Sequence, residues 1–159
     1  MKLTSQEEYG LRCLLQIARE GEGGSLTIPL ISALEGITQP YAAKLMRVLR
    51  QGGFVKSARG QIGGYTLARP AEQIVVGEVL AVLGGRLYDP AFCERHTGGL
   101  FVCSNSTDCS VRQLWRTVQR VVDQVLSKTT LKDLLRTEKQ MTSWVAHIGQ
   151  PGAQPSVSG

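Results

Sequence analysis

The stretch TIPLISALEGITQPYAAKLMRVLRQGGFV, residues 27–55, contains two short apolar segments on either side of a glycine. In the first segment, Thr27 precedes a first-turn proline, and Gly36 follows the last apolar position. Proline at a helix start and glycine just past its end are ordinary boundary signals. We therefore predict a short helix over 27–35, whose buried side is formed by Leu30, Ile31 and Leu34.

The second segment has the pattern of a longer helix. Thr38 can cap it, Pro40 lies in its first turn, and the Gly52-Gly53 pair ends it. Helical spacing divides the other residues into two sets: Leu45, Val48 and Leu49 inward, and Tyr41, Lys44, Arg47 and Arg50 outward. Two helices joined by a tight turn, the second with cationic and hydrogen-bonding side chains near its start, predict a helix-turn-helix.

The segment FVKSARGQIGGYTLAR, residues 54–69, follows directly and has the alternation of two strands around a glycine-rich turn. We expect the first strand to begin at Phe54 and the second at Tyr65. A hairpin directly after a helix-turn-helix is expected to be a wing rather than a plain surface hairpin. Arg59, near the tip, is suited to a narrow minor groove, where the negative potential is deepest.

Charge is unevenly distributed around these elements. The chain has 159 residues and a formal net charge of +5, yet no acidic residue lies between Glu35 and Glu72. That window holds six cations: Lys44, Arg47, Arg50, Lys56, Arg59 and Arg69. A cationic stretch without carboxylates is typical of phosphate binding, because each neutralised phosphate releases counterions. A solvated basic face has the same composition, but the helix-turn-helix context favours double-stranded DNA as the partner.

Helices are predicted on both sides of this unit. Residues 4–24 begin with the spacing of a capping box, Ser5 with Glu8, and continue as an apolar stripe that ends in glycines. Cys13 lies beside the stripe and is expected to be a small buried hydrophobe. Residues 71–84 are expected to form one linking helix, with these buried positions: Ile74, Val75, Val79 and Val82.

The other three cysteines lie in the middle of the chain. Cys93 and Cys103 fall in a polar, glycine-rich segment, 85–108, and Cys109 opens a long helix. The apolar positions of that helix keep helical spacing over several turns: Val111, Leu114, Trp115, Val118, Val121, Val122, Val125 and Leu126. So extensive a stripe has too little of its own domain to pack on. We expect it to pack on the same helix of a second subunit, in a two-fold homodimer.

These patterns predict a mainly α fold with a small β wing, organised in four parts. Residues 1–84 form a winged helix-turn-helix domain with its linking helix, and residues 85–108 form the cysteine-bearing loop. Residues 109–148 contain the dimerisation helix and a short C-terminal helix over 131–139, and residues 149–159 are expected to be a disordered tail.

Several classes of protein are disfavoured. Residues 1–20 carry several charges, and no run of about 18 apolar residues occurs, so we expect a soluble, cytoplasmic protein with no membrane partner. Thiols stay reduced in that compartment, so the cysteines point to metal or redox chemistry. No catalytic triad, phosphate-cradling glycine loop or pair of catalytic carboxylates can be assembled, so the chain is not expected to be an enzyme.

Four motifs occur in a characteristic order: MKLTSQEEYGLR (1–12), ITQPYAAKLMRVLRQGGFV (37–55) and ARGQIGGYTLAR (58–69) leading into IVVGEVLAVL (74–83). Together with the cysteine loop and the long helix, they resemble the IscR/NsrR-type family of winged-helix transcription regulators, many of which carry an iron–sulfur cluster. The likeness covers residues 1 to about 137, and the tail lies outside it.

The resemblance implies a DNA-binding set at the start and outer face of the second helix of the helix-turn-helix and in the wing: Thr38, Gln39, Pro40, Tyr41, Lys44, Arg47, Lys56 and Arg59. Tyr41 and Lys44 are expected to reach base edges or phosphates, whereas Arg47 and Lys56 are expected to contact phosphates only.

The resemblance also implies that Cys93, Cys103 and Cys109 bind an iron–sulfur cluster, for which soft thiolates on a flexible loop are suitable donors. The gap between Cys93 and Cys103 is wider than in many relatives, whereas the gap between Cys103 and Cys109 fits. Where 2Fe-2S members have a histidine ligand, this chain has Arg112, so a 4Fe-4S cluster is favoured. Its fourth ligand would be Glu8 from the first helix of the second subunit.

Each of these residues also has a second interpretation. Glu8 can serve as a helix cap. His96, inside the loop, is either another candidate ligand or a solvated residue. The three thiols can be simply reduced, or can bind zinc, although zinc prefers paired CxxC motifs, which the chain lacks.

The leading hypothesis is a dimeric transcription regulator that senses iron, redox state or nitric oxide through a cysteine-ligated cluster. The alternative is a cluster-free regulator of the same fold that uses a cysteine thiol switch or a protein or metabolite partner. An electron-transfer iron–sulfur protein is a different class of function, and it leaves the acid-free window and the wing unexplained.

Overall fold

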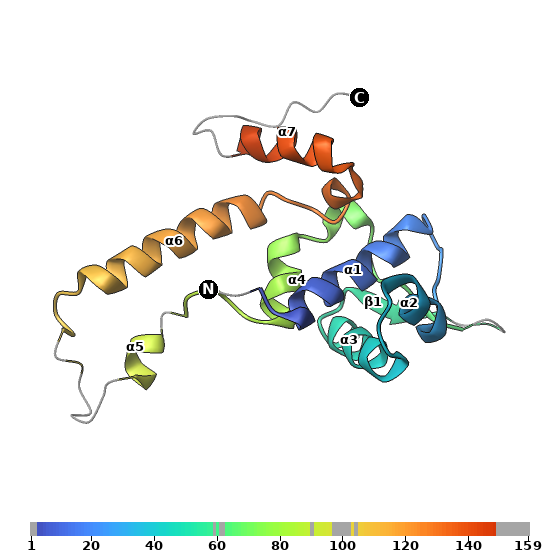
Figure 1. The fold of residues 1–159 in the computed structure, drawn as a ribbon, viewed down its shortest axis with the longest axis horizontal. Coiled ribbons are helices and arrows are strands. Elements are labelled where there is room, and N and C mark those ends of the chain that lie inside the picture. The colour runs from blue at the N-terminus through green and yellow to red at the C-terminus, as the bar shows by residue number, and fades with distance from the viewer. Residues whose placement is uncertain are drawn as a thin grey trace.

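The computed structural model describes residues 3–58, 60, 63–89, 91–96, 103 and 105–148. Helices make up most of it, accompanied by a two-stranded antiparallel sheet (Figure 1), which confirms the predicted fold class. In chain order the elements are α1 (Ser5–Arg19), α2 (Ile28–Glu35), α3 (Gln39–Gln51), β1 (Val55–Ser57), β2 (Tyr65–Leu67), the 3-10 turn η1 (Ala71–Gln73), α4 (Val76–Leu83), α5 (Phe92–Arg95), α6 (Ser110–Leu126), the 3-10 turn η3 (Asp133–Leu135) and α7 (Glu138–Ile148).

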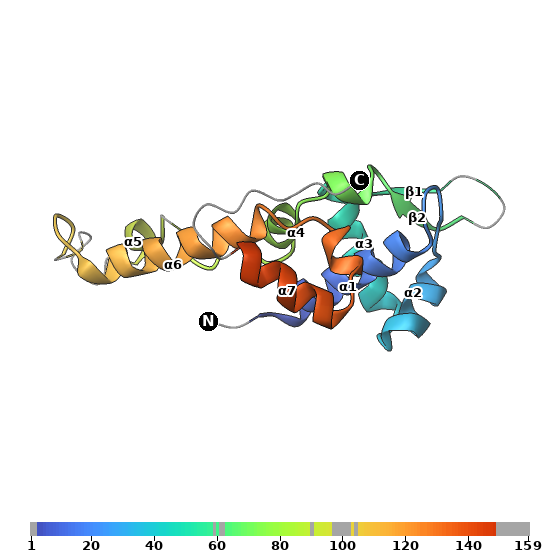
Figure 2. The same ribbon diagram turned by 90° about the horizontal axis from the view of Figure 1, so that it is seen from above.

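The helices α1 to α4 and the hairpin gather into one body, which we name the head (residues 3–83). The helix α6 extends away from the head as an arm, and α5 lies toward the outer end of that arm (Figures 1 and 2). This arrangement leaves much of α6 without a neighbour from its own chain.

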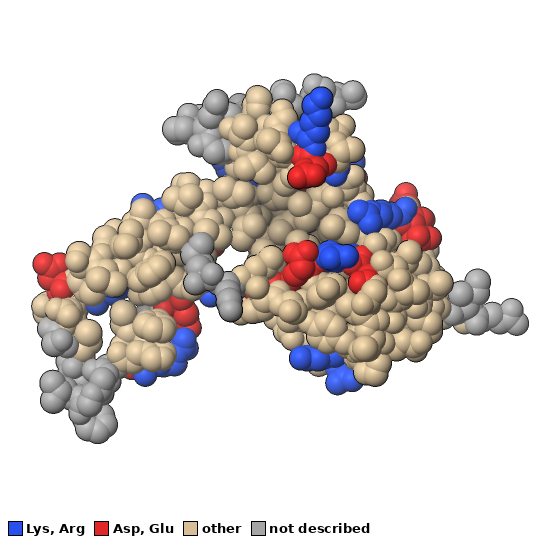
Figure 3. Space-filling model, viewed as in Figure 1, with Lys and Arg blue, Asp and Glu red and all other residues tan. Residues whose placement is uncertain are grey.

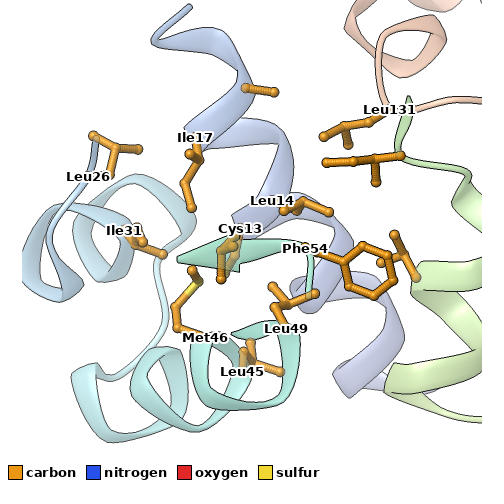
Figure 4. Packing of buried hydrophobic residues seen from close by; sticks show 14 of the residues in the cluster. Cys13, Leu14, Ile17, Leu26, Ile31, Leu45, Met46, Leu49, Phe54 and Leu131 are labelled. Carbon is orange, nitrogen blue, oxygen red and sulfur yellow. The ribbon is translucent and has the colours of Figure 1, made fainter. Parts of the chain in front are cut away.

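The core of the head forms where α1 and α3 meet β1 and α4 (Figure 4). Leu14, Leu45, Leu49 and Phe54 are all buried there, and Leu131 closes the core from the segment after α6. Burying one side chain of this size stabilises the fold by about 1.5–3 kcal/mol relative to leaving it exposed. These contacts fix which face of α3 points inward and therefore which face remains exposed.

Cys13 belongs to this core and is completely buried. Burial raises the pKa of its thiol to about 12. Such a thiol stays protonated and unreactive at neutral pH. The prediction that Cys13 is a packing residue is confirmed.

The predicted buried side of α2 is wrong in two of its three positions. Leu30 and Leu34 are 50% and 54% exposed, whereas Ile31 is fully buried. One turn after Ile31, the inward position is taken by Glu35, which is also buried. Residues four apart lie on one face of a helix, so this eight-residue helix turns the pair Ile31 and Glu35 toward α1.

The cap of α1 lies one residue earlier than predicted. Thr4, not Ser5, is the N-cap, and its side chain accepts from the backbone N–H of Glu7. The carboxylate of Glu7 in turn accepts from the backbone N–H of Thr4 at 2.8 Å, which completes a capping box. The sequence TSQEE contains two pairs with capping-box spacing, Thr4 with Glu7 and Ser5 with Glu8, and the structure uses the first pair. The carboxylate of Glu8 is thereby left out of the cap.

The linking segment is not one helix over 71–84. It divides into η1 and α4, and the residues between them pair with the segment after α6. The backbone N–H of Val76 donates to Thr129 at 2.9 Å, and that of Leu131 donates to Ile74 at 2.8 Å. Val82, predicted to be buried, is 42% exposed. This short pairing joins the head to the end of α6.

The predicted helix over 131–139 is also replaced. Asp133 accepts from the backbone N–H and the hydroxyl of Thr130, and the turn ends as η3. A new helix, α7, then begins, where Thr137 and Gln140 exchange side-chain to backbone hydrogen bonds in the manner of a capping box. The hydropathy pattern predicted one helix here, but the hydrogen bonds at Thr130 and at Thr137 divide the stretch into η3 and α7.

The segment predicted as irregular, 85–108, contains the short helix α5. The tail over 149–159, predicted to be disordered, lies outside the described residues. Among the residues that the structure does describe, there is no helix with the length and apolarity needed to cross a bilayer.

Candidate DNA-binding surface and cysteine site

The outer face of α3 is cationic. Ala42, Leu45, Met46 and Leu49 are buried, and this places Lys44, Arg47 and Arg50 on the exposed side of the helix. Figure 3 shows Lys and Arg side chains at the lower surface of the head, over α3, with no acidic side chain beside them in that view. Within the described part of the chain, no ion pair involves these three residues or Lys56. Their charge is therefore available to an external anion.

The start of α3 is held in place by local contacts. Thr38 is the N-cap and accepts from the backbone N–H of Tyr41 at 3.4 Å, as predicted, and both Gln39 and Pro40 are exposed. The ring of Tyr41 is half-buried and meets the ring of Tyr9 from α1 edge-on, with centroids 6.3 Å apart. Tyr41 therefore joins α1 to the N-terminal end of α3, and part of its ring remains accessible.

The hairpin confirms the predicted pair of strands, with Val55 opposite Leu67. Tyr65 also pairs with Leu26, which attaches the hairpin to the segment before α2. Gly64, at φ +100°, is required here because a Cβ at this position would lie 2.5 Å from the carbonyl oxygen of Leu26. Lys56 is exposed on β1. Arg59, the predicted wing-tip residue, lies outside the described residues.

A buried carboxylate fixes α2 to α1, and sequence analysis missed it. The side chain of Glu35 is 2% exposed and accepts from Nε of Arg12 at 2.6 Å and from Nε2 of Gln16 at 2.5 Å. A buried charge needs such partners, since unpaired burial is costly. The available signal was the position of Glu35, four residues after Ile31 on the same face of α2.

The three mid-chain cysteines are half-buried, and each occupies a different local structure. Cys93 lies in α5, Cys103 begins a turn in which its carbonyl accepts from Ser106 at 3.0 Å, and Cys109 is the N-cap of α6. All three belong to the described residues, and among those residues no three His, Cys, Asp or Glu side chains form a group that could hold a metal ion. A single chain in this conformation does not assemble the predicted ligand set.

The start of α6 is organised around Cys109. Its sulfur accepts from the backbone N–H of Arg112 at 3.3 Å, so the thiol serves as the cap of the helix. Both terminal nitrogens of the Arg112 guanidinium donate to the carbonyl of Ser106 at 3.1 Å. Arg112, which stands where some relatives have a histidine ligand, therefore closes the turn before the helix.

Cys93 lies beside a buried tyrosine. Its sulfur is 3.6 Å from the hydroxyl oxygen of Tyr88, which is 8% exposed. This hydrogen bond raises the pKa of the Tyr88 hydroxyl. Tyr88 was not predicted as a functional residue, because nothing in the local pattern indicates that it is buried.

The two candidates for a fourth ligand have different surroundings. Glu8 is exposed, and its carboxylate contacts only the guanidinium of Arg12, at 4.0 Å, among the described ion pairs. His96 stacks on Phe92, with ring centroids 4.1 Å apart, and its Nδ1 lies 2.9 Å from the carbonyl oxygen of Phe92. The helix-cap interpretation of Glu8 is wrong because Glu7 makes the cap. His96 follows α5 as its C-cap and is exposed, with its Nδ1 engaged by the carbonyl of Phe92.

Three helices, α1 to α3, of which the third has a basic outer face, followed by a hairpin, define the class of winged helix-turn-helix DNA-binding proteins. Residues 3–137 match the model of the Rrf2 family, described as "Iron-dependent Transcriptional regulator". The chain therefore belongs to the Rrf2 family of transcription regulators. This membership confirms the resemblance noted from the motifs, and it identifies the protein as a regulator rather than an enzyme.

Individual relatives agree with this assignment. The chain is 37% identical over 136 residues to protein rrf2 of Nitratidesulfovibrio vulgaris, a match that covers 86% of this chain and 88% of that protein. The structure of IscR from T. potens is 32% identical, with a TM-score of 0.66, and covers 85% of this chain and 86% of that one. The oxidized form of CymR from Staphylococcus aureus is 28% identical, with a TM-score of 0.67, and covers 86% of this chain and 98% of that one.

Proposed function

We propose that this regulator works in the cytoplasm as a homodimer that binds an operator duplex through α3 and the wing. Cys93, Cys103 and Cys109 bind an iron–sulfur cluster, preferably 4Fe-4S, and Glu8 of the second copy supplies the fourth donor. The state of the cluster sets the affinity for the operator. The observation that carries the proposal is the basic outer face of α3, in a head whose last helix, α4, leads into the segment that bears the three thiols.

DNA binding is supported by the geometry of the head. The core holds α3 so that Lys44 and Arg47 point outward one turn apart, and Thr38, Gln39 and Pro40 lie exposed at its N-terminal end. In helix-turn-helix proteins the N-terminal residues of this helix contact base edges, and cations further along bind phosphates. Lys56, which is exposed on β1, and Arg59 are proposed to bind phosphates from the wing.

Dimerisation is supported by the uncovered face of α6. Val111, Leu114 and Val121 are 60%, 58% and 55% exposed, and Trp115 is 42% exposed. These residues lie on one side of a 17-residue helix that extends away from the head. Apolar side chains repeated at this spacing are typical of a helix that pairs with a second copy.

The donor chemistry of the cysteine segment suits a cluster. Three thiols are half-buried and accessible, in contrast to Cys13, and Glu8 is free of the helix cap. Arg112 is engaged with Ser106 and cannot ligate, which favours the cluster type that takes a carboxylate. When bound, an iron–sulfur cluster supplies a group whose charge and integrity respond to iron, oxidants or nitric oxide.

The residues of this chain can transmit such a change because of where they lie. Cys109 caps α6 and Cys93 lies on the segment that joins α4 of the head to α6. Ligation requires the sulfurs to converge, so it must move this segment relative to the position described here. The orientation of α6, and with it the spacing of two heads in a dimer, changes accordingly. A regulator needs such a difference in DNA affinity between its two states.

The thiol-switch alternative has an observation of its own. The three sulfurs do not form a ligand group within the described residues. CymR of Staphylococcus aureus, a relative in structure and sequence, has been solved in an oxidized form. A disulfide between two of the mid-chain cysteines would also change the path of the chain before α6.

Counting iron and sulfide in protein purified without oxygen separates these two functions. We expect the wild type to contain both in the ratio of a 4Fe-4S cluster, and the variant C93S/C103S/C109S to contain neither, because the soft donors are lost. C13A is the matched control and should keep its iron, since Cys13 is sealed in the core. Wild-type protein that lacks iron and sulfide and forms a disulfide on oxidation would favour the thiol switch.

A further inference from the structure

A chain of hydrogen bonds joins the thiol of Cys93 to the middle of α6. The hydroxyl of Tyr88 lies 3.6 Å from the sulfur, and the backbone N–H of Tyr88 donates to Oε1 of Gln119 at 2.7 Å. Nε2 of Gln119 donates to Asp123 at 2.8 Å, and the other oxygen of Asp123 is paired with Arg86. Tyr88 and Gln119 are 8% and 6% exposed. The four residues Arg86, Tyr88, Gln119 and Asp123 are named the clasp below.

The clasp lies near the junction of α1, α4 and α6. Arg86 and Tyr88 follow directly on α4, whose last residue, Leu83, accepts a hydrogen bond from the side chain of Gln6 in α1. Gln119 and Asp123 belong to α6. A surface hollow of about 420 Å³ lies beside them, between α1, α4 and α6. At this point the head and the arm meet through polar contacts beside an open hollow, and such a junction can shift.

Because Gln119 and Tyr88 are buried, a displacement of either residue that breaks their hydrogen bond is costly. A buried amide that loses its partner carries the full cost of desolvation, so Gln119 holds the backbone of Tyr88 at one place on α6. The sulfur of Cys93 is a stronger acceptor as a thiolate than as a thiol, and a weak one within a disulfide. The contact with the Tyr88 hydroxyl thus depends on the chemical state of the sulfur.

The geometry points to Tyr88 as a positioning residue that donates its hydroxyl hydrogen to the Cys93 sulfur and, through Gln119, passes the state of that sulfur to α6. This inference rests on the proposed function, since it names how the cysteine segment acts on the arm. An unligated, reduced Cys93 holds Tyr88 and the clasp in register, as in this structure, whereas a ligated or modified sulfur releases the hydroxyl and loosens the backbone contact to Gln119.

The test uses full-length, cluster-free protein with the substitutions C103S/C109S, in which Cys93 is the one mid-chain thiol. Methyl methanethiosulfonate converts Cys93 to a methyl disulfide, and amide hydrogen exchange is measured at Tyr88 and along α6. We expect modification to accelerate exchange of the Tyr88 amide by about tenfold, the effect of weakening one buried hydrogen bond. The added variant Y88F lacks the same hydroxyl contact, so its residue-88 amide should already exchange about tenfold faster and should no longer respond to modification.

Two further variants define the clasp. Q119L should accelerate exchange at Tyr88 by about tenfold without any modification, because the acceptor is removed. Q124L, which changes an exposed glutamine on the same helix, should have no effect. An equal response to modification in Y88F and its parent, or no response in the parent, would overturn the role of Tyr88. If Q119L fails to fold, Y88F, a loss of one oxygen atom, still decides the question.

This experiment needs neither cluster nor DNA, so its failure is distinguishable from failure of the proposed function. If exchange of the Tyr88 amide does not respond to modification of Cys93, the role of the clasp is contradicted. Cluster-dependent DNA binding is unaffected by that result. The converse result is a clasp that responds as expected while the cluster-bound and cluster-free forms bind DNA with equal affinity. That result would contradict the proposed function but not the role of the clasp.

Discussion

We expect the double substitution K44A/R47A to lower the affinity for an operator duplex by about 100-fold or more. Both side chains lie on the exposed face of α3 and are paired with no carboxylate among the described residues. Loss of one side-chain contact to a base or phosphate costs about 1–3 kcal/mol, so two such contacts cost about 2–6 kcal/mol, a range that contains the ~2.8 kcal/mol of a 100-fold change.

The operator is obtained by selection from a random-sequence duplex library, and affinity is measured by fluorescence anisotropy over a range of salt. The slope of log affinity against log salt should become shallower by about 2 in the variant, since about one unit is lost with each phosphate contact. The control is K128A/K139A, which removes the same charge from exposed positions in the turn after α6 and on α7. An equal loss in both variants would contradict a specific role for α3 and indicate attraction by net charge alone.

The second large effect is expected from charges on the face of α6. The variant L114E/V121E should be monomeric at concentrations where the wild type is a dimer, with dimer affinity lowered by at least about 100-fold. Each of these side chains contributes about 1.5–3 kcal/mol when buried, and a carboxylate in an apolar interface adds a desolvation cost. Operator affinity should fall as well, because two linked heads bind far more tightly than one.

Sedimentation velocity measures the oligomeric state directly. V145E is the control, because Val145 is an apolar residue on α7 with 42% exposure, similar to that of Trp115. It should leave the dimer intact. A wild-type protein that is monomeric at all concentrations, or an L114E/V121E variant that remains a dimer, would contradict dimerisation through α6.

Local signals explain why the head was predictable from the sequence. Thr38 at the cap, Pro40 in the first turn and Gly36 at the preceding end define α3 and its turn without reference to the rest of the chain. The alternation around Tyr65 likewise defined the hairpin. The cationic side of α3 followed from helical spacing once its apolar side was known, and the structure places Lys44, Arg47 and Arg50 outward as expected. Tyr41, also predicted to face outward, is instead half-buried against Tyr9 of α1.

Features that depend on contacts distant in the chain were not predictable. The exposure of Leu30 and Leu34 results from Glu35 being drawn inward by Arg12 and Gln16 in another helix. The break between η1 and α4 results from pairing with residues more than fifty positions later, and the contact between Tyr88 and Gln119 spans 31 positions. The N-cap of α1 was mispredicted for a local reason: Thr4 with Glu7 and Ser5 with Glu8 both have the spacing of a capping box.

The cysteine site was predictable in its donors but not in its assembly. Reduced thiols indicated metal or redox chemistry, and the resemblance to the family implied Cys93, Cys103 and Cys109 as the ligands. Cys13 was correctly set apart as a buried residue. Convergence of three sulfurs and a carboxylate depends on a cofactor and on a second subunit. The sequence of one chain contains no information on where a cofactor or a second subunit would lie. The ligand set therefore stays a proposal.

The most direct test of the account is one titration of the selected operator with two preparations of the same protein, one containing its cluster and one from which the cluster has been removed without oxidising the thiols. The selection is made with both forms, so that neither is favoured. Sensing by the cysteine segment predicts affinities that differ by about 5-fold to 150-fold, the usual range of coupling between two sites. Equal affinities for the two forms, measured under the same salt, would contradict the claim that the state of these cysteines governs DNA binding.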